Sequence, residues 1–119
     1  MSRPVIVKLI GNAVEEFERL NEIVEEEKNK GIEKSESQQL LKSIERTVEL
    51  LKHNPQYGIQ IKKSLIPKKF PVDNLWKVNL TGYWRMIYTL KGDKVEVICF
   101  VLEILDHKRY NKLFGYRKK

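Results

Sequence analysis

Cysteine is almost absent from this sequence, since Cys99 is the only one among 119 residues. A lone cysteine forms no internal disulfide, so nothing in the chain indicates an oxidising compartment, and we expect Cys99 to be an inert core residue. Histidine is scarce as well, and His53 and His107 lie far apart in the sequence. No group of histidine, cysteine and acidic residues has the spacing of a metal site, and no glycine-rich loop has phosphate-cradling spacing. The sequence therefore predicts neither a metal nor another cofactor.

Long apolar runs are also absent. The longest, over residues 97–102, has six residues, whereas a helix needs about 20 apolar residues to cross a bilayer. The chain begins with a short apolar run but has no cleavable small-residue site, so we expect no secretion signal. These absences predict a soluble, cytoplasmic protein without membrane contact. The length of 119 residues predicts a single domain over 1–119.

Charge is distributed unevenly along the chain. Residues 12–53 carry 11 acidic and 7 basic residues, whereas residues 54–119 carry 5 acidic and 14 basic residues. The whole chain has a formal net charge of +7. A basic C-terminal half is typical of surfaces that attract nucleic-acid phosphates. A basic face that is merely solvated gives the same composition, so charge alone leaves both interpretations open.

Two stretches have the apolar period of amphipathic helices. The first covers residues 13–30, with Asn12 as its expected N-cap. The second covers residues 35–53, where Ser35 and Gln38 fit the capping-box pattern. The short link between them predicts an antiparallel helical hairpin whose apolar side needs a partner.

Strand-forming residues gather before and after this hairpin, separated by turn residues. The predicted strands cover residues 4–10, 75–80, 83–90 and 94–104. A short basic tail or helix over 108–114 follows them. The order β-α-α-β-β-β predicts an α+β fold in which the helical hairpin packs on a mostly antiparallel four-stranded sheet. The other face of that sheet is expected to be partly open.

The connection between the second and third predicted strands allows two registers. A two-residue loop at 81–82 pairs Lys77 with Met86, and a three-residue loop at 80–82 pairs Lys77 with Arg85. The second register separates polar from apolar side chains better, and Gly82 suits its left-handed position. It places four side chains on one face: Lys77, Asn79, Tyr83 and Arg85. Like charges directly across a sheet repel, so an anion between Lys77 and Arg85 is one explanation and two side chains bending into water is the other.

These strands resemble a known protein family. The segments LWKVNL (75–80), GYWRMIY (82–88) and KVEVI (94–98) resemble consecutive strands of RelE/ParE-type toxins of type II toxin–antitoxin systems. The segment HKRYNKLFG (107–115) is similar to the tail of archaeal RelE-like members. The resemblance implies a toxin held inactive by a cognate antitoxin, typically an extended or helical peptide that wraps the basic sheet. RelE-like members cut mRNA in the ribosomal A site, whereas ParE-like members inhibit DNA gyrase.

The resemblance also implies roles for single residues. Lys77 matches a catalytic-lysine position, and Arg85 matches the arginine that contacts the scissile phosphate. His107, Arg109 and Tyr110 fall where the family places late basic, histidine or tyrosine residues, and of these His107 and Tyr110 are expected to be catalytic. The RNA-contacting residues expected beside these are Lys62, Lys63, Lys68, Lys69, Asn79, Tyr83 and Arg109. Asn79 departs from the pattern, because some active members have a second lysine there.

The chemistry of RNA cleavage suits these residue types. RNA carries its own nucleophile, the 2′-hydroxyl, so the protein has to neutralise the phosphorane charge and protonate the leaving 5′-oxygen. Lys77 and Arg85 supply charge, and an arginine fork fits a phosphate in bidentate fashion. His107 is the candidate general acid, because its ordinary pKa suits proton transfer near neutrality. Tyr110 is expected to stack on a base or bond to a phosphate.

Three functions therefore stay open from the sequence. The first is a ribosome-dependent mRNA endoribonuclease that needs no metal, with mRNA, the ribosome and an antitoxin as partners. The second is a gyrase inhibitor of the ParE type, and the third is a non-catalytic RNA-binding relative, which Asn79 favours. The cluster around His107 favours the nuclease, because a pure binder needs no proton-transfer group.

Overall fold

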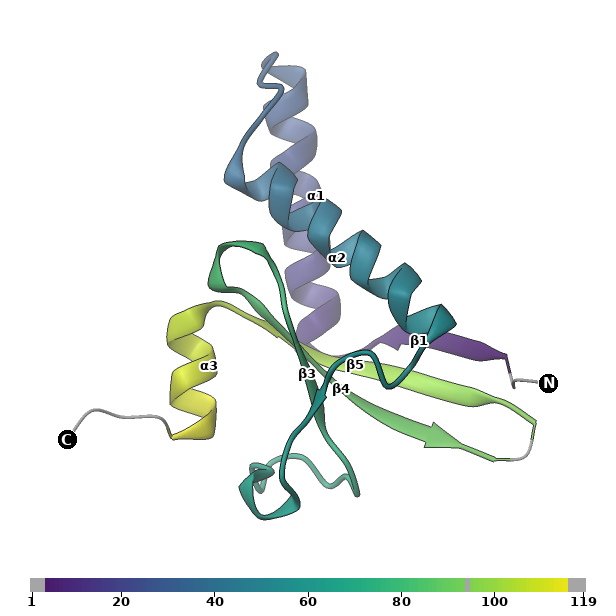
Figure 1. The fold of residues 1–119 in the computed structure, drawn as a ribbon. Coiled ribbons are helices and arrows are strands. Elements are labelled where there is room, and N and C mark those ends of the chain that lie inside the picture. The colour runs from purple at the N-terminus through teal and green to yellow at the C-terminus, as the bar shows by residue number, and fades with distance from the viewer. Residues whose placement is uncertain (1–3, 94, 116–119) are drawn as a thin grey trace.

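The computed structural model describes residues 4–93 and 95–115 of the chain. It has a mixed α+β architecture, as the sequence predicts, with a sheet covered by helices (Figure 1). The strands are β1 (Val5–Leu9), β2 (Ile59–Gln60), β3 (Trp76–Asn79), β4 (Arg85–Gly92) and β5 (Val97–Leu105), and the α-helices are α1 (Asn12–Asn29), α2 (Glu36–His53) and α3 (His107–Phe114). Every element predicted from the sequence is present within a few residues of its expected bounds. Lys94, where the last strand is predicted to begin, lies outside the described residues.

The sheet has the strand order β1-β5-β4-β3-β2. Only the β1–β5 pair is parallel among the described strands, so the sheet is mostly antiparallel, as expected. The prediction of four strands is wrong, because β2 adds a fifth at the edge, where Ile59 pairs with Lys77. A two-residue strand has no side-chain alternation to recognise, and it exists because the β3 backbone offers it partners.

The helices α1 and α2 cover one face of the sheet and bury the main core there. Their apolar sides meet the inward residues of β3, β4 and β5, among them Val78, Met86 and Val101. Cys99 is fully buried in this core, and burial raises the pKa of its thiol to about 12, which agrees with the expectation of an inert residue. None of the described helices is both long and apolar enough to span a membrane.

The opposite face of the sheet carries a smaller apolar cluster. Leu75, which directly precedes β3, packs here with Ile87 of β4 and Leu105 of β5 against Tyr110 of α3. The connector between β2 and β3 adds half-buried apolar side chains to the same cluster, namely Ile61, Ile66, Phe70 and Val72. The face is therefore covered in part by α3 and the connector, and polar residues of β3 and β4 surround that cover.

The helix starts agree with the sequence at one of the two predicted N-caps. Ser35 caps α2 by accepting a hydrogen bond from the Gln38 backbone N–H at 3.1 Å, but the Gln38 side chain leaves the capping box and donates to Glu27 and to the Ile32 carbonyl. The predicted Asn12 cap is wrong, because α1 already begins at Asn12 and Gly11 occupies the cap position without a side-chain hydrogen bond. Asn12 Oδ1 is buried and has no hydrogen-bond partner within the described structure.

The β3–β4 hairpin differs in register from both sequence-based alternatives. Asn79 pairs with Arg85 and Lys77 with Ile87, so the turn lies one residue later than predicted, at Thr81–Tyr83. The shift from the favoured register is two residues, which preserves the faces: Lys77, Asn79 and Arg85 still share one side. The prediction that Lys77 lies directly opposite Arg85 is wrong, because the two residues are diagonal neighbours. The strands therefore impose less repulsion between them than expected.

Candidate functional site

Lys77 and Arg85, on the α3 side of the sheet, both contact the ring of Tyr110. The Lys77 Nζ atom lies 5.3 Å from the centre of the Tyr110 ring, and the Arg85 Cζ atom lies 5.2 Å from it. Lys77 comes from β3, Arg85 is the first residue of β4, and Tyr110 stands on α3. An aromatic face attracts cations through its quadrupole. Contact with the Tyr110 ring therefore offsets part of the repulsion between the charges of Lys77 and Arg85.

Tyr110 itself is 4% exposed. Its ring packs against Phe114, with the ring centres 4.8 Å apart, and its hydroxyl accepts a hydrogen bond from Lys77 Nζ at 3.0 Å. The Tyr110 ring is therefore occupied by contacts within the protein, and its predicted contact with RNA stays a prediction. What the tyrosine does is orient the ammonium group of Lys77.

The charge of this pair is not neutralised by acidic neighbours. Among the described residues, neither Lys77 nor Arg85 has an ion-pair partner within 4.0 Å. Arg85 donates from Nη1 to the Trp84 carbonyl at 3.3 Å, while its Nε is buried and finds no partner in the described structure. Buried donors without acceptors are costly, and a half-buried guanidinium with unused donors favours a visiting anion such as phosphate.

His107 lies at the start of α3 and is exposed. Its ring centre is 5.9 Å from that of Tyr83, with the ring planes 60° apart. The Asn111 amide contacts His107 Nε2 at 3.1 Å from the next helical turn. The structure thus brings His107 next to Tyr83, while Tyr110, on the same helix, touches both cations.

Arg109 has different partners from those expected of an RNA-binding residue. It forms ion pairs with Glu16 of α1 at 3.2 Å and with Asp106 at 3.4 Å. Its Cζ atom also lies 5.5 Å from the centre of the Trp84 ring. These contacts connect α3 to α1, and the predicted RNA contact of Arg109 stays a prediction.

Asp106 sets the start of α3. Its carboxylate accepts a hydrogen bond from the Arg109 backbone N–H at 2.8 Å, in the manner of an N-cap. Partial burial raises the pKa of Asp106, but that hydrogen bond and the charges of Arg109 and Lys108 outweigh it, so the pKa lies below its usual range. For Arg109, partial burial lowers the pKa, and its bonds to Glu16 outweigh this effect and raise it.

Three of these residues escape sequence reasoning. Glu16 and Asp106 hold α3 and Asn111 contacts His107, yet each looks like an ordinary polar residue in the sequence. Only the spacing of Asp106, three residues before Arg109 at the start of a helical stretch, carried a signal, because it matches an N-cap.

The remaining predicted RNA-contacting residues are exposed. The connector lysines and Asn79 have exposed side chains: Lys62, Lys63, Lys68, Lys69 and Asn79. Lys69 forms an ion pair with the buried Glu103 at 2.9 Å, so part of its charge is already compensated. Contact with RNA stays a prediction for all five.

Comparison with known proteins supports the architecture. No protein-family model matches the chain, and no curated protein matches it significantly. A solved structure, the YoeB/ParE toxin from Agrobacterium tumefaciens, superposes with a TM-score of 0.56 at 13% sequence identity. The match covers 86% of this chain and 98% of that one.

The chain has the fold of a YoeB/ParE toxin. At this identity the comparison concerns the backbone alone, and it does not distinguish the RelE-like branch from its relatives. Within the described residues, no three histidine, cysteine, aspartate or glutamate side chains gather closely enough to hold a metal ion.

Proposed function

We propose that this chain is the toxin of a toxin–antitoxin pair and acts in the cytoplasm as an endoribonuclease on ribosome-bound mRNA. The observation that carries the proposal is the convergence of Lys77 and Arg85 on Tyr110 without an acidic partner within the described structure. The shared fold with a YoeB/ParE toxin supports it. The RelE-like character and the single domain over 1–119 belong to the same proposal.

The chemistry follows from the placement of charge. A phosphate bound at Arg85 and Lys77 has its developing negative charge neutralised as the 2′-oxygen attacks phosphorus and its proton passes to water. The bond from phosphorus to the 5′-oxygen breaks, and His107 gives a proton to that leaving oxygen. The products are a 2′,3′-cyclic phosphate and a 5′-hydroxyl. Neither a metal nor a cofactor enters the proposed steps.

The position of His107 favours a nuclease over a gyrase inhibitor. It is exposed, its Nε2 has a polar neighbour in Asn111, and it stands on the helix that carries Tyr110 to the cations. A protein that only binds gyrase has no use for a proton donor there. The gyrase inhibitor and the non-catalytic relative remain outcomes of the experiment below.

The experiment adds the purified chain to a cell-free translation reaction with a defined mRNA and maps the new RNA ends. Cleavage with 5′-hydroxyl products is expected, and Arg85→Ala or His107→Ala should each reduce the rate by roughly 10²–10³-fold. Arg46→Ala and His53→Ala are matched controls, because both residues are exposed on α2. A supercoiling assay runs in parallel.

The outcomes separate the three functions. Inhibited supercoiling without mRNA cleavage identifies the gyrase inhibitor. If neither activity is found, the result supports the third function, a non-catalytic RNA-binding protein. If both Arg85→Ala and His107→Ala cleave like the wild type, the proposed site is wrong. The antitoxin partner is tested separately, since the product of a neighbouring small reading frame should abolish cleavage when added.

A further inference from the structure

Tyr83 has a backbone conformation that its side chain disfavours. Its φ angle is 64°, and no other non-glycine residue among those described has a positive φ. Glycine, asparagine and aspartate adopt this left-handed conformation readily, whereas a bulky aromatic residue there is an outlier that costs stability. Such outliers persist only where the surrounding structure imposes them, and they gather at functional sites.

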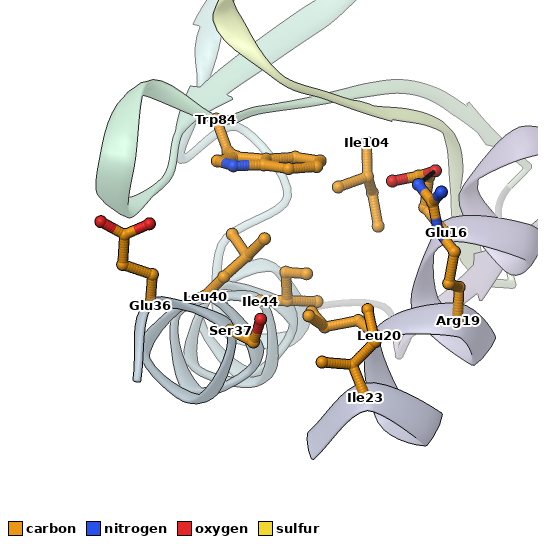
Figure 2. Close-up of a pocket in the computed structure, with 10 residues that line it drawn as sticks. All are labelled: Glu16, Arg19, Leu20, Ile23, Glu36, Ser37, Leu40, Ile44, Trp84 and Ile104. Carbon is orange, nitrogen blue, oxygen red and sulfur yellow. Dashed lines mark hydrogen bonds and ion pairs between the residues drawn. The ribbon is translucent and has the colours of Figure 1, made fainter. Parts of the chain in front are cut away.

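The surroundings of Tyr83 do impose this conformation. The Leu80 N–H donates to the Trp84 carbonyl at 2.7 Å and closes the turn, while the Thr81 N–H donates to Ser43 Oγ of α2 at 3.2 Å. Trp84, the next residue, covers a cleft of about 210 Å³. Figure 2 shows its indole ring over Leu40 and beside Ile104. The turn is thereby anchored on both sides of Tyr83.

The strained side chain is not used for packing. Tyr83 is 73% exposed, the largest exposed fraction among the exposed large apolar side chains described. If the ring were buried in the core, its packing energy could offset the backbone strain. This ring instead faces solvent beside His107. The anchored turn thus presents an exposed aromatic ring to solvent, next to the helix that contacts both cations.

We propose that Tyr83 stacks on the nucleobase next to the bond that is cleaved, with His107 beside it, and so determines where the RNA backbone meets Arg85. This inference deepens the proposed function and rests on it. Every base has a face that stacks on an aromatic ring. Because the turn is anchored on both sides of Tyr83, the backbone that carries this ring needs no ordering when the base arrives. Tyr83 would then act on substrate affinity, whereas Arg85 and His107 act on the reaction.

The variant Tyr83→Asn tests this assignment, because asparagine tolerates the left-handed conformation and lacks the ring. Two opposite effects are expected. The midpoint temperature of unfolding should rise, while cleavage at subsaturating ribosome concentration should fall about 5- to 150-fold, the range of base–aromatic stacking. Tyr83→Phe should stay close to the wild type. Tyr57→Asn removes another exposed tyrosine and serves as the control.

A second measurement ties the effect to a base. Once the cleavage position is mapped, mRNAs with an abasic site on either side of that bond are compared in wild type and Tyr83→Asn. On one side of the bond, the abasic site should slow cleavage by the wild type, whereas it should have little further effect on cleavage by Tyr83→Asn. Equal slowing of both proteins on both sides would overturn the inference and leave the nuclease standing. A fall in midpoint temperature for Tyr83→Asn would also overturn it, since the ring would then serve the fold. A wild type that does not cleave would remove the proposed function together with this inference.

Discussion

The hydroxyl of Tyr88 links two parts of the chain that are distant in sequence. It donates to the Pro55 carbonyl at 2.8 Å and accepts from the Gly58 N–H at 3.0 Å. Burial raises the pKa of Tyr88 to about 12, so the hydroxyl stays protonated and keeps both roles at neutral pH. A side chain at Gly58 has no room, because a Cβ there would lie 2.6 Å from the Lys77 carbonyl. The chain after α2 is therefore fixed against the same strand that presents Lys77.

We predict that Tyr88→Phe destabilises the protein by about 0.5–1.5 kcal/mol, because the partly buried backbone groups of Pro55 and Gly58 lose their hydrogen-bond partner. Chemical denaturation measures the loss, and amide exchange should show faster opening at Gly58. Tyr57→Phe is the control, since Tyr57 is exposed. An unchanged exchange rate at Gly58 would show that the hydroxyl does not hold the connector.

At the scale of elements, α3 is the helix on which the candidate site depends. It begins at the Asp106 cap and ends at Gly115, whose φ of 71° suits a glycine after a helix. Its eight residues are too few to be helical alone, so its position comes from contacts with the rest of the protein. The Tyr110 ring fixes one side of it and the Arg109–Glu16 ion pair another.

The Asp106 cap predicts a specific dependence of stability on pH. Because its folded-state pKa is lowered, the carboxylate contributes stability above its unfolded pKa of about 3.9, and this contribution disappears as pH falls through the folded value. Asp106→Asn keeps a capping oxygen and removes the charge.

Wild type should therefore exceed Asp106→Asn in stability at pH 6, by less than about 1 kcal/mol because the side chain is partly exposed, and the difference should shrink below about pH 4. Denaturation at several pH values measures it, with Asp73→Asn as the exposed control. A difference that stays constant down to pH 2 would contradict the assigned role of the charge.

The pair Glu16–Arg109 predicts a coupling between α1 and α3. A double-mutant cycle with Glu16→Gln and Arg109→Gln should give about 1 kcal/mol or less, because the Arg109 side chain is 37% exposed. The single variants should also speed amide exchange in α3. The exposed pair Glu49–Lys52 is the control and should give almost no coupling. Zero coupling at Glu16–Arg109 would mean that Tyr110 alone positions the helix.

At the scale of the whole molecule, periodicity predicts the element order, the helical hairpin and the two faces of the central hairpin. The faces of β3 and β4 were predictable because side chains alternate, so a register error of two residues leaves every side chain on its own side. The register of the β3–β4 hairpin was not predictable, because it depends on Tyr83 adopting a left-handed conformation that usually requires glycine. Strand β2 was missed because it is too short to have a pattern.

The candidate site was predictable only in part, because local alternation fixes the face of a side chain but not its tertiary contacts. Lys77 and Arg85 are on one face because of local alternation. Tyr110 and Arg109 were expected to act on RNA from the family resemblance, yet tertiary contacts decide what each side chain touches. The burial of Tyr110 and the ion pair of Arg109 with Glu16 come from residues far away in sequence, which no local pattern reveals.

The parallel pairing of β1 with β5 has a consequence for the synthesis of this protein. Val5 pairs with Val97, so β1 stays without its neighbour until β5 has been synthesised more than 80 residues later. Tyr110, which orients Lys77, is translated later still. A nascent chain attached to its ribosome therefore lacks both the finished sheet and the assembled cation pair. If this protein cuts the messages of translating ribosomes, the ribosome that makes it is spared until the last helix has emerged.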